Sequence, residues 1–348
     1  MPDESAPPLD ERKARILDAI VREYVTHGEP VGSKRLVETY RLNVSAATVR
    51  NEMSALEESG YIAQPHTSAG RVPTDRGYRH FVDAIGRPGP LTEGERSALR
   101  GFLGSSHDLE DLLRRTTSVL AQLTRHAAMV LAPAVDRTRV KLVELVDLTP
   151  RTVLVLFISE TGRVEKRMVE LDRPFAPSDL ARVRALVNTA AAGIRLAEVR
   201  DAIVGQTETA PSELHALLAA VAEVATVVDD DASPDRVFVG GHAALAGAGT
   251  FPGDDLHHLY ELLEERLTLS KLLAESTAGA GPVVRIGEEN TTLGVRSASL
   301  VTTAYGSSSA GSLGVIGPTR MDYPSVIAAV QAVADQLQAS LLDLTEGE

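Results

Sequence analysis

A short polar run carries the side chains of this chain that are best suited to reading a nucleic acid: Ser45, Ala47, Thr48, Arg50 and Asn51. Arg can donate two hydrogen bonds to guanine O6 and N7, and Asn can pair in the same way with adenine N6 and N7. Ala and the methyl group of Thr suit contact with thymine methyl groups. We therefore predict that Ala47, Thr48, Arg50 and Asn51 contact bases. Ser45, at a helix N-terminus, is expected to bond a phosphate beside the helix dipole.

Further along the chain, four polar residues surround an Ala-Gly pair that suits a hairpin tip: His66, Thr67, Ser68 and Arg71. Such side chains bond phosphate oxygens or reach the minor groove, and we expect these four to hold the DNA backbone. Two alternatives remain for these residues. A polar helix surface is usually only solvated, and winged helices also serve as dimerisation modules. The polar hairpin tip favours DNA binding over both.

Three helices and a hairpin are predicted to position these side chains. The apolar spacing indicates helices over residues 10–27, 33–40 and 45–60. Ser33 and Ser45 stand at the N-cap positions of the second and third helices. A strand over 61–64 and a hairpin tip over 66–73 follow the third helix. In that helix an apolar stripe packs on the other two helices and leaves the polar face outside: Ala46, Val49, Met53 and Leu56. Three helices followed by a β-hairpin predict a winged helix-turn-helix over residues 10–86.

The rest of the chain alternates between strand-like and helical patterns. Strands are expected over 141–148, 152–159, 164–171, 237–239, 283–286, 299–305 and 313–316. Helices are expected within 92–127, 177–192, 212–228, 254–267 and 324–344. The fold class is therefore α+β. Because strands lie on both sides of an acidic block, we predict one domain formed by residues 87–208 and 281–348, with an insert over 209–280. Residues 1–9 form a polar tail that we expect to be disordered.

The charge distribution supports this division. The whole chain has 35 Lys+Arg against 48 Asp+Glu, a net charge of −13, which argues against a protein that coats nucleic acid. Residues 209–280 hold 3 Lys+Arg against 12 Asp+Glu, whereas residues 32–80 hold seven basic against five acidic. The acidic insert is therefore expected to stay off DNA. Its apolar stripes suit either a core of its own or a core shared with a second copy.

Other chemistry finds little support in the sequence. The chain has no Cys, which excludes disulfides and thiolate zinc sites, and it shows no phosphate-binding loop or metal-binding helix motif. We assign no catalytic, cofactor-binding or metal-binding residues, and we do not expect an enzyme. The polar N-terminus lacks the apolar segment of a signal peptide, so we expect a cytoplasmic protein that does not enter a membrane.

Two long motifs resemble the signatures of a known family, the HrcA heat-inducible transcription repressors of bacteria. The N-terminal motif comprises Glu29-Pro30-Val31-Gly32-Ser33, Ser45-Ala46-Ala47-Thr48-Val49-Arg50-Asn51-Glu52-Met53 and Pro65-His66-Thr67-Ser68-Ala69-Gly70-Arg71-Val72-Pro73-Thr74. The C-terminal motif is Gly314-Val315-Ile316-Gly317-Pro318-Thr319-Arg320-Met321-Asp322-Tyr323. With the order of elements, the resemblance covers nearly the whole chain. The segment 209–280 matches in position more than in sequence.

The resemblance implies more than the residues alone can indicate. It implies a winged helix, a GAF-like domain in two parts (87–208 and 281–348) and a dimerisation domain inserted at 209–280. It also implies a homodimer on an inverted-repeat operator of double-stranded DNA, the CIRCE element, upstream of chaperonin and DnaK-type operons. A GroE-type chaperonin would assist the repressor, and heat shock would release it. The alternative is a ligand-responsive winged-helix regulator whose GAF-like domain binds a small molecule.

Overall fold

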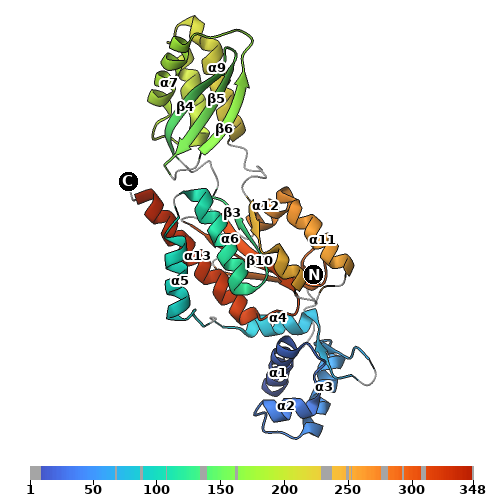
Figure 1. The fold of residues 1–348 in the computed structure, drawn as a ribbon. Coiled ribbons are helices and arrows are strands. Elements are labelled where there is room, and N and C mark those ends of the chain that lie inside the picture. The colour runs from blue at the N-terminus through green and yellow to red at the C-terminus, as the bar shows by residue number, and fades with distance from the viewer. Residues whose placement is uncertain are drawn as a thin grey trace.

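The computed structural model describes residues 9–66, 69–86, 89–106, 108–133, 139–160, 164–228, 237–247, 251, 253–275, 281–291, 294–306 and 311–346. Within these ranges the chain is a mixture of helices and antiparallel sheets, as the predicted α+β class requires. A helical N-terminal unit lies at one end of the molecule, a small sheet with its own helices lies at the other, and a larger sheet lies between them (Figure 1).

The N-terminal unit contains the three helices and the hairpin that the sequence predicts: α1 (Glu11–His27), α2 (Ser33–Thr39), α3 (Ala46–Glu58), β1 (Ile62–Ala63) and β2 (Val72–Pro73). A further helix, α4 (Asp75–Ala84), follows them and was not predicted. Strands β1 and β2 pair antiparallel, with Ile62 opposite Pro73. Of the predicted tail 1–9, residues 1–8 lie outside the described residues, and Leu9 packs against the apolar core of the unit.

Local signals set the ends of these helices. The Asp10 side chain accepts a hydrogen bond from the Lys13 backbone N–H at the start of α1, and Gly28 ends the helix in the left-handed conformation at φ 75°. The predicted Ser33 cap of α2 is wrong. Gly32 occupies the N-cap position without a side-chain bond, because Ser33 is already the first helical residue and turns into the core at 7% exposure.

Five antiparallel strands build the central sheet in the order β7-β3-β10-β9-β8. They are β7 (Val237–Gly240), β3 (Ala127–Leu131), β10 (Gly311–Pro318), β9 (Ala298–Tyr305) and β8 (Val283–Ile286). Side chains alternate between two apolar cores. Ala128 and Val130 face α5 (Glu93–Leu103), α6 (Leu109–Thr124) and α13 (Tyr323–Glu346). Ala127 and Met129 face α10 (His242–Gly247), α11 (Gly253–Glu264) and α12 (Arg266–Ala274).

Helix α13 is the longest helix of the described chain. Residues Tyr323–Leu344 are long and apolar enough to cross a membrane by length and composition alone. Val330, Val333 and Leu337 are fully buried against the central sheet and its neighbouring helices. Packing within the protein therefore accounts for the apolar face of this helix.

The second sheet has the order β4-β5-β6 and confirms the predicted meander: β4 (Val140–Thr149), β5 (Thr152–Ser159) and β6 (Val164–Glu170). One of its faces carries α7 (Pro177–Ala191), α8 (Leu196–Thr207) and, after the short η2 (Ser212–Leu214), α9 (His215–Val228). The opposite face exposes apolar side chains. We call it the open sheet face, formed by Leu142, Val146, Leu148, Leu154, Leu156 and Met168.

The core of the β4–β6 sheet and the cores of the central sheet do not follow the predicted domain boundaries. The segment 209–280 is divided, because α9 packs with the β4–β6 sheet while β7, α11 and α12 pack with the central sheet. The predicted domain part 87–208 is divided as well, since β3 and β10 are neighbours in a sheet that excludes β4–β6. The unit that interrupts the central sheet therefore spans the described residues between 139 and 228. We call it the inserted unit.

Candidate nucleic-acid interface

Ser45 is the N-cap residue of α3, as the sequence predicts. The Ser45 Oγ accepts a hydrogen bond from the Thr48 backbone N–H at 3.1 Å and lies 2.9 Å from Thr48 Oγ1. This cap satisfies one N–H group of the first turn at an exposed position, next to the positive end of the helix dipole. Ser45 thus fixes the start of α3, and its hydroxyl would share the cap with any phosphate contact.

One face of α3 is exposed and polar, and the opposite face is buried. On the exposed face, Ala47, Arg50 and Asn51 are exposed and Thr48 is half-buried. On the opposite face, the apolar stripe of Val49, Met53 and Leu56 is buried, with exposures of 0, 5 and 0%. Within the described ranges, the side chains of Arg50 and Asn51 make no hydrogen bond or ion pair. The structure therefore brings the four predicted base-contacting residues to one free surface.

The exposed face of α3 continues to Ser54, which was not among the predicted contact residues. Ser54 lies four residues after Arg50, is exposed, and donates a hydrogen bond from Oγ to the Arg50 carbonyl at 3.2 Å. The helical spacing of three and four residues from Asn51 and Arg50 is the signal that could have identified it. A base reader on this stripe would extend to Ser54.

Acidic side chains on the flanks of α3 are neutralised by neighbouring elements. Glu52 lies 3.5 Å from Arg12 and 3.8 Å from Lys13, both at the start of α1. Glu57 pairs with Arg71 of the hairpin at 2.8 Å. In α3, Arg50 lies in the N-terminal half beside the paired Glu52, and Glu58 follows the paired Glu57 at the C-terminal end.

The hairpin tip is hydrogen-bonded to the segment that joins α1 to α2. The backbones of Val31 and Arg71 exchange hydrogen bonds of 2.8 and 2.9 Å, and the Gln64 amide donates to the Ala69 carbonyl at 3.0 Å. Gly70 is required here, because a Cβ would lie 2.5 Å from the Val31 carbonyl oxygen. His66 is exposed beside this tip. Thr67 and Ser68, both predicted backbone contacts, lie outside the described residues.

Arg71 differs from the other predicted contacts. Its guanidinium donates to Glu57 through Nε at 2.9 Å and Nη2 at 2.8 Å, and its side chain is only 20% exposed. Both contacts converge on one carboxylate oxygen, Oε2, so the charge-assisted pair ties the hairpin to α3 without the two-oxygen fork of a bidentate pair. In the free protein Arg71 therefore braces the hairpin against α3, and a phosphate contact would have to compete with Glu57.

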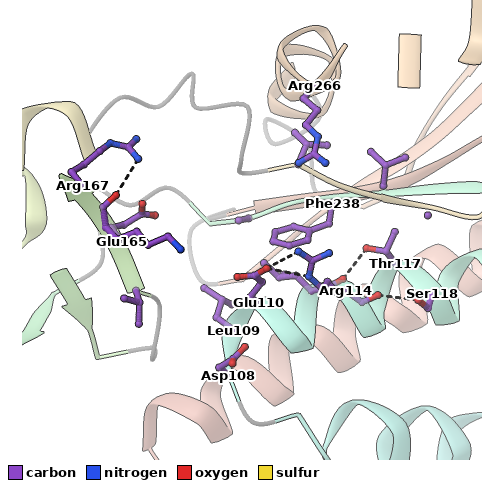
Figure 2. A pocket seen from close by; sticks show the side chains of 17 residues that line it. Asp108, Leu109, Glu110, Arg114, Thr117, Ser118, Glu165, Arg167, Phe238 and Arg266 are labelled. Carbon is purple, nitrogen blue, oxygen red and sulfur yellow. Dashed lines mark hydrogen bonds and ion pairs between the residues drawn. The ribbon is translucent and has the colours of Figure 1, made fainter. Parts of the chain in front are cut away.

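A cleft of about 630 Å³ lies between the inserted unit and the central sheet. Figure 2 shows Arg114, Arg167 and Arg266 around it, with the Arg114 guanidinium beside the ring of Phe238. Arg114 lies 5.5 Å from the centroid of that ring and pairs with Glu110 at 2.6 Å. The lining combines aromatic surface with charges of both signs. This cleft could not be predicted from the sequence, because most of its lining residues come from α6, β6, β7 and α12, which are distant in the chain.

Comparison with known proteins first places the chain in a class, the transcription repressors. A family model described as "HrcA protein C terminal domain" matches residues 110–327. The heat-inducible transcription repressor HrcA of Acidothermus cellulolyticus is 46% identical over 332 residues, covering 94% of this chain and 97% of the relative. The same repressor of Streptomyces avermitilis is 45% identical with the same coverage of both chains. The chain belongs to the HrcA family of heat-inducible transcription repressors.

A solved crystal structure shares the fold. It is described as that of a hypothetical protein, superimposes with a TM-score of 0.64, and is 22% identical over 97% of this chain and 100% of that chain. Its similarity therefore extends through the N-terminal unit, the central sheet and the inserted unit.

Proposed function

We propose that this protein is a cytoplasmic, heat-inducible transcription repressor that binds double-stranded DNA through the exposed face of α3. The observation that carries the proposal is the exposed stripe of Ala47, Arg50 and Asn51 on a capped helix, in a chain that belongs to a repressor family. In this proposal α1–α3 and the β1–β2 hairpin act as a winged helix-turn-helix, with α3 as the recognition helix.

The charge of α3 supports a particular docking direction. Glu58 at its C-terminal end would be repelled by phosphates, whereas the N-terminal half offers Arg50 and the positive helix end. The first two turns of α3 therefore enter the major groove. Bases are contacted by Ala47, Thr48, Arg50 and Asn51, and the backbone is held by Ser45, His66, Thr67, Ser68 and Arg71.

The proposed operator is an inverted repeat bound by a homodimer. A two-fold axis in the protein matches a two-fold axis in the DNA, so each α3 reads one half-site. The open sheet face is the surface we assign to the dimer, in place of the 209–280 segment. Leu142, Val146 and Met168 are 40, 37 and 72% exposed there, while the other face of the sheet is covered by α7–α9. An apolar face of this kind is stabilised when a second copy covers it.

The finer features of the proposal rest on the family resemblance. The central sheet of β3 and β7–β10, with helices on both faces, serves as the GAF-like domain. Compared with the predicted parts 87–208 and 281–348, it loses the inserted unit and gains β7 with α10–α12. The operator is the CIRCE element before chaperonin and DnaK-type operons, and a GroE-type chaperonin assists folding of the repressor. Refolding of DNA-binding activity with and without chaperonin, across temperature, tests this. Equal yields at all temperatures would contradict it.

Binding to defined DNA tests the core of the proposal. We expect the full chain to bind a symmetric inverted repeat more tightly than one half-site, and a half-site more tightly than random DNA, in a mobility-shift titration at fixed salt. Specific sites typically exceed non-specific ones by about 10³-fold or more. Equal affinity for all three DNAs would overturn the proposed function.

A second candidate function is a ligand-responsive repressor, and the charged cleft beside Phe238 is the observation that favours it. A small molecule there would contact the inserted unit and the central sheet together. A thermal-shift screen of anionic metabolites, followed by operator binding with each hit, tests this candidate. A compound that stabilises the protein and changes its operator affinity would support it, and Arg114→Gln should remove both effects.

A further inference from the structure

Helix α4 holds the C-terminal end of the recognition helix. Arg76 donates from Nη1 to the Ser59 carbonyl at 3.0 Å, and its guanidinium lies 4.6 Å from the centroid of the Tyr61 ring. Gly77 lies directly against the Tyr61 carbonyl, since a Cβ there would be 2.1 Å from the oxygen. Backbone contacts this close leave no room for α3 and α4 to move separately.

The next turn of the same helix holds the central sheet. Arg79 donates from Nε to Glu289 Oε1 at 2.8 Å and from Nη2 to the Val284 carbonyl at 2.6 Å, and it makes a further short contact with Glu289 Oε2. Glu289 itself accepts from the Ile286 backbone N–H at 2.9 Å. Both members of the pair are therefore anchored, although they lie 210 residues apart in the chain. Glu289 belongs to a short turn, η5 (Gly287–Glu289), directly after β8.

The first turn of α4 makes a second contact with η5. Asp75 Oδ2 accepts a hydrogen bond from the Glu288 backbone N–H at 3.1 Å. Gly287 permits this approach, because it has φ 52° and a Cβ would lie 1.8 Å from Asp75 Oδ2. Burial raises the pKa of Asp75. We call Asp75 and Arg79 with Gly287–Glu289 the α4 clamp.

Apolar contacts run alongside the α4 clamp. The rings of Tyr78 and Tyr323 lie 5.8 Å apart, and both side chains are buried. Arg320 lies over the Tyr24 ring at 6.0 Å and against Gly28 at the end of α1. One continuous core joins the N-terminal helices to α13 and the central sheet. The orientation of α3 relative to the central sheet is thus fixed through α4.

We propose that the α4 clamp sets the half-site spacing that the protein accepts, with Arg79 and Glu289 as positioning residues that touch no DNA. The inference rests on the proposed binding of an inverted repeat. In a dimer each recognition helix must reach its half-site from a fixed subunit. One added base pair moves the second half-site by about 3.4 Å and rotates it by roughly 35°. A rigid joint cannot follow that displacement, whereas a loosened joint can.

The test uses the full-length protein and a series of DNAs: the inverted repeat, the same repeat lengthened or shortened by one and two base pairs, and a single half-site. For the wild type we expect affinity to fall on the order of tenfold or more at altered spacing, because simultaneous engagement is lost. For Arg79→Gln and Glu289→Gln we expect the affinity to fall by less than about threefold between the original spacing and the altered spacings. Half-site affinity should equal that of the wild type in both variants.

Two further variants keep the result interpretable. Arg100→Gln removes an ion pair with Glu93 of the same helix, α5, and should keep the wild-type spacing preference. The reversed pair Arg79→Glu/Glu289→Arg should regain part of that preference, which would show that the single variants act through the joint and not by unfolding.

Three results would overturn the inference. Wild-type spacing preference in Arg79→Gln and Glu289→Gln would show that the clamp does not fix the spacing. Equal losses on the half-site and on the repeat would place Arg79 in the folding of the N-terminal unit itself. A wild type that binds the repeat no better than one half-site would overturn the proposed dimeric function as well, and this outcome is distinct from the other two.

Discussion

The exposed face of α3 and the open sheet face lie at opposite ends of the molecule and differ in chemistry (Figure 1). The α3 face is polar, and its acidic neighbours are neutralised by Arg12, Lys13 and Arg71. The open sheet face is mainly apolar, with Met168 exposed at 72%, and carries Glu144 and Lys166 on either side of Leu156. A polar face is stable in water and becomes specific when it meets a polar partner, whereas an apolar face is stabilised by being covered. The difference is what the proposed function uses, with one surface for DNA and the other for a second copy of the chain.

Charging the open sheet face should have the largest effect. Val146, Leu154 and Met168 lie side by side across the three strands, so Val146→Glu/Met168→Glu places two carboxylates around Leu154. We expect a monomer by light scattering and an affinity for the inverted repeat that is lower by about 10²–10⁴-fold, because the second half-site is no longer bound by a linked copy. Val204→Glu, at an exposed apolar position on α8, is the matched control. A variant that remains dimeric would remove this face from the dimer.

Acid should destabilise the central sheet that joins the two surfaces. Burial lowers the pKa of His126 to about 4, and its ring packs against Gly317. Below an unfolded-state pKa near 6.5 the unfolded chain binds the proton first, so stability falls as the pH falls from 6.5 toward 4, by roughly 3 kcal/mol at most. Urea unfolding at pH 7 and 4.5 should show this loss in the wild type and a smaller loss in His126→Gln. Identical pH dependence in the two proteins would contradict the assignment.

Removing Arg50 should weaken the polar surface alone. Arg50→Ala is expected to cost about 1–3 kcal/mol of specific binding and to relax the preference at one base position, because a bidentate contact to a base is lost. The dimer should be unaffected. A mobility-shift titration against operators with single base changes measures both quantities. Wild-type affinity with wild-type base preference would show that this helix does not read the DNA.

The pair of Arg71 and Glu57 should give the smallest effect. Glu57→Gln removes an acid from the interface and frees the Arg71 guanidinium, so we expect DNA binding to strengthen by a few-fold, or less than about 1 kcal/mol. Arg71→Gln should reduce the slope of log affinity against log salt by no more than about one unit. The slope measured between low and moderate salt checks both variants. Weaker binding by Glu57→Gln would mean that bracing of the hairpin matters more than a free cation.

Local signals predicted the N-terminal unit well. The Ser45 cap, the stripe of Val49, Met53 and Leu56, and the left-handed Gly60 all act within a few residues, so their positions can be read along the chain. The pairing of Arg71 with Glu57 could not be predicted, because it depends on how the hairpin folds back on α3. The same holds for the contacts of Arg79 with β8 and η5, which join distant parts of the sequence.

The boundaries of the inserted unit were missed for a different reason. Strand β3 is buried on both faces, so Ala127–Leu131 is a continuous apolar run directly after a helix and lacks the alternation that marks a half-buried strand. Without β3, the strands of the meander were the natural partners for β8–β10. The helix α8 was also missed, because no helix was predicted between 192 and 212.

The pairing of β3 with β7 has a consequence for how the molecule can be taken apart. Leu131 and Val237 stand opposite each other in the sheet, so the chain leaves the central domain and returns to it at nearly the same point. In topological terms the inserted unit is the loop of one very long hairpin. Closing a loop costs only slightly more as it lengthens. Replacing residues 134–236 by a short Gly-Ser turn should therefore leave a foldable monomer that carries the recognition helix. Cutting the chain at this point should likewise separate the proposed DNA-binding and dimerisation functions into two exchangeable modules.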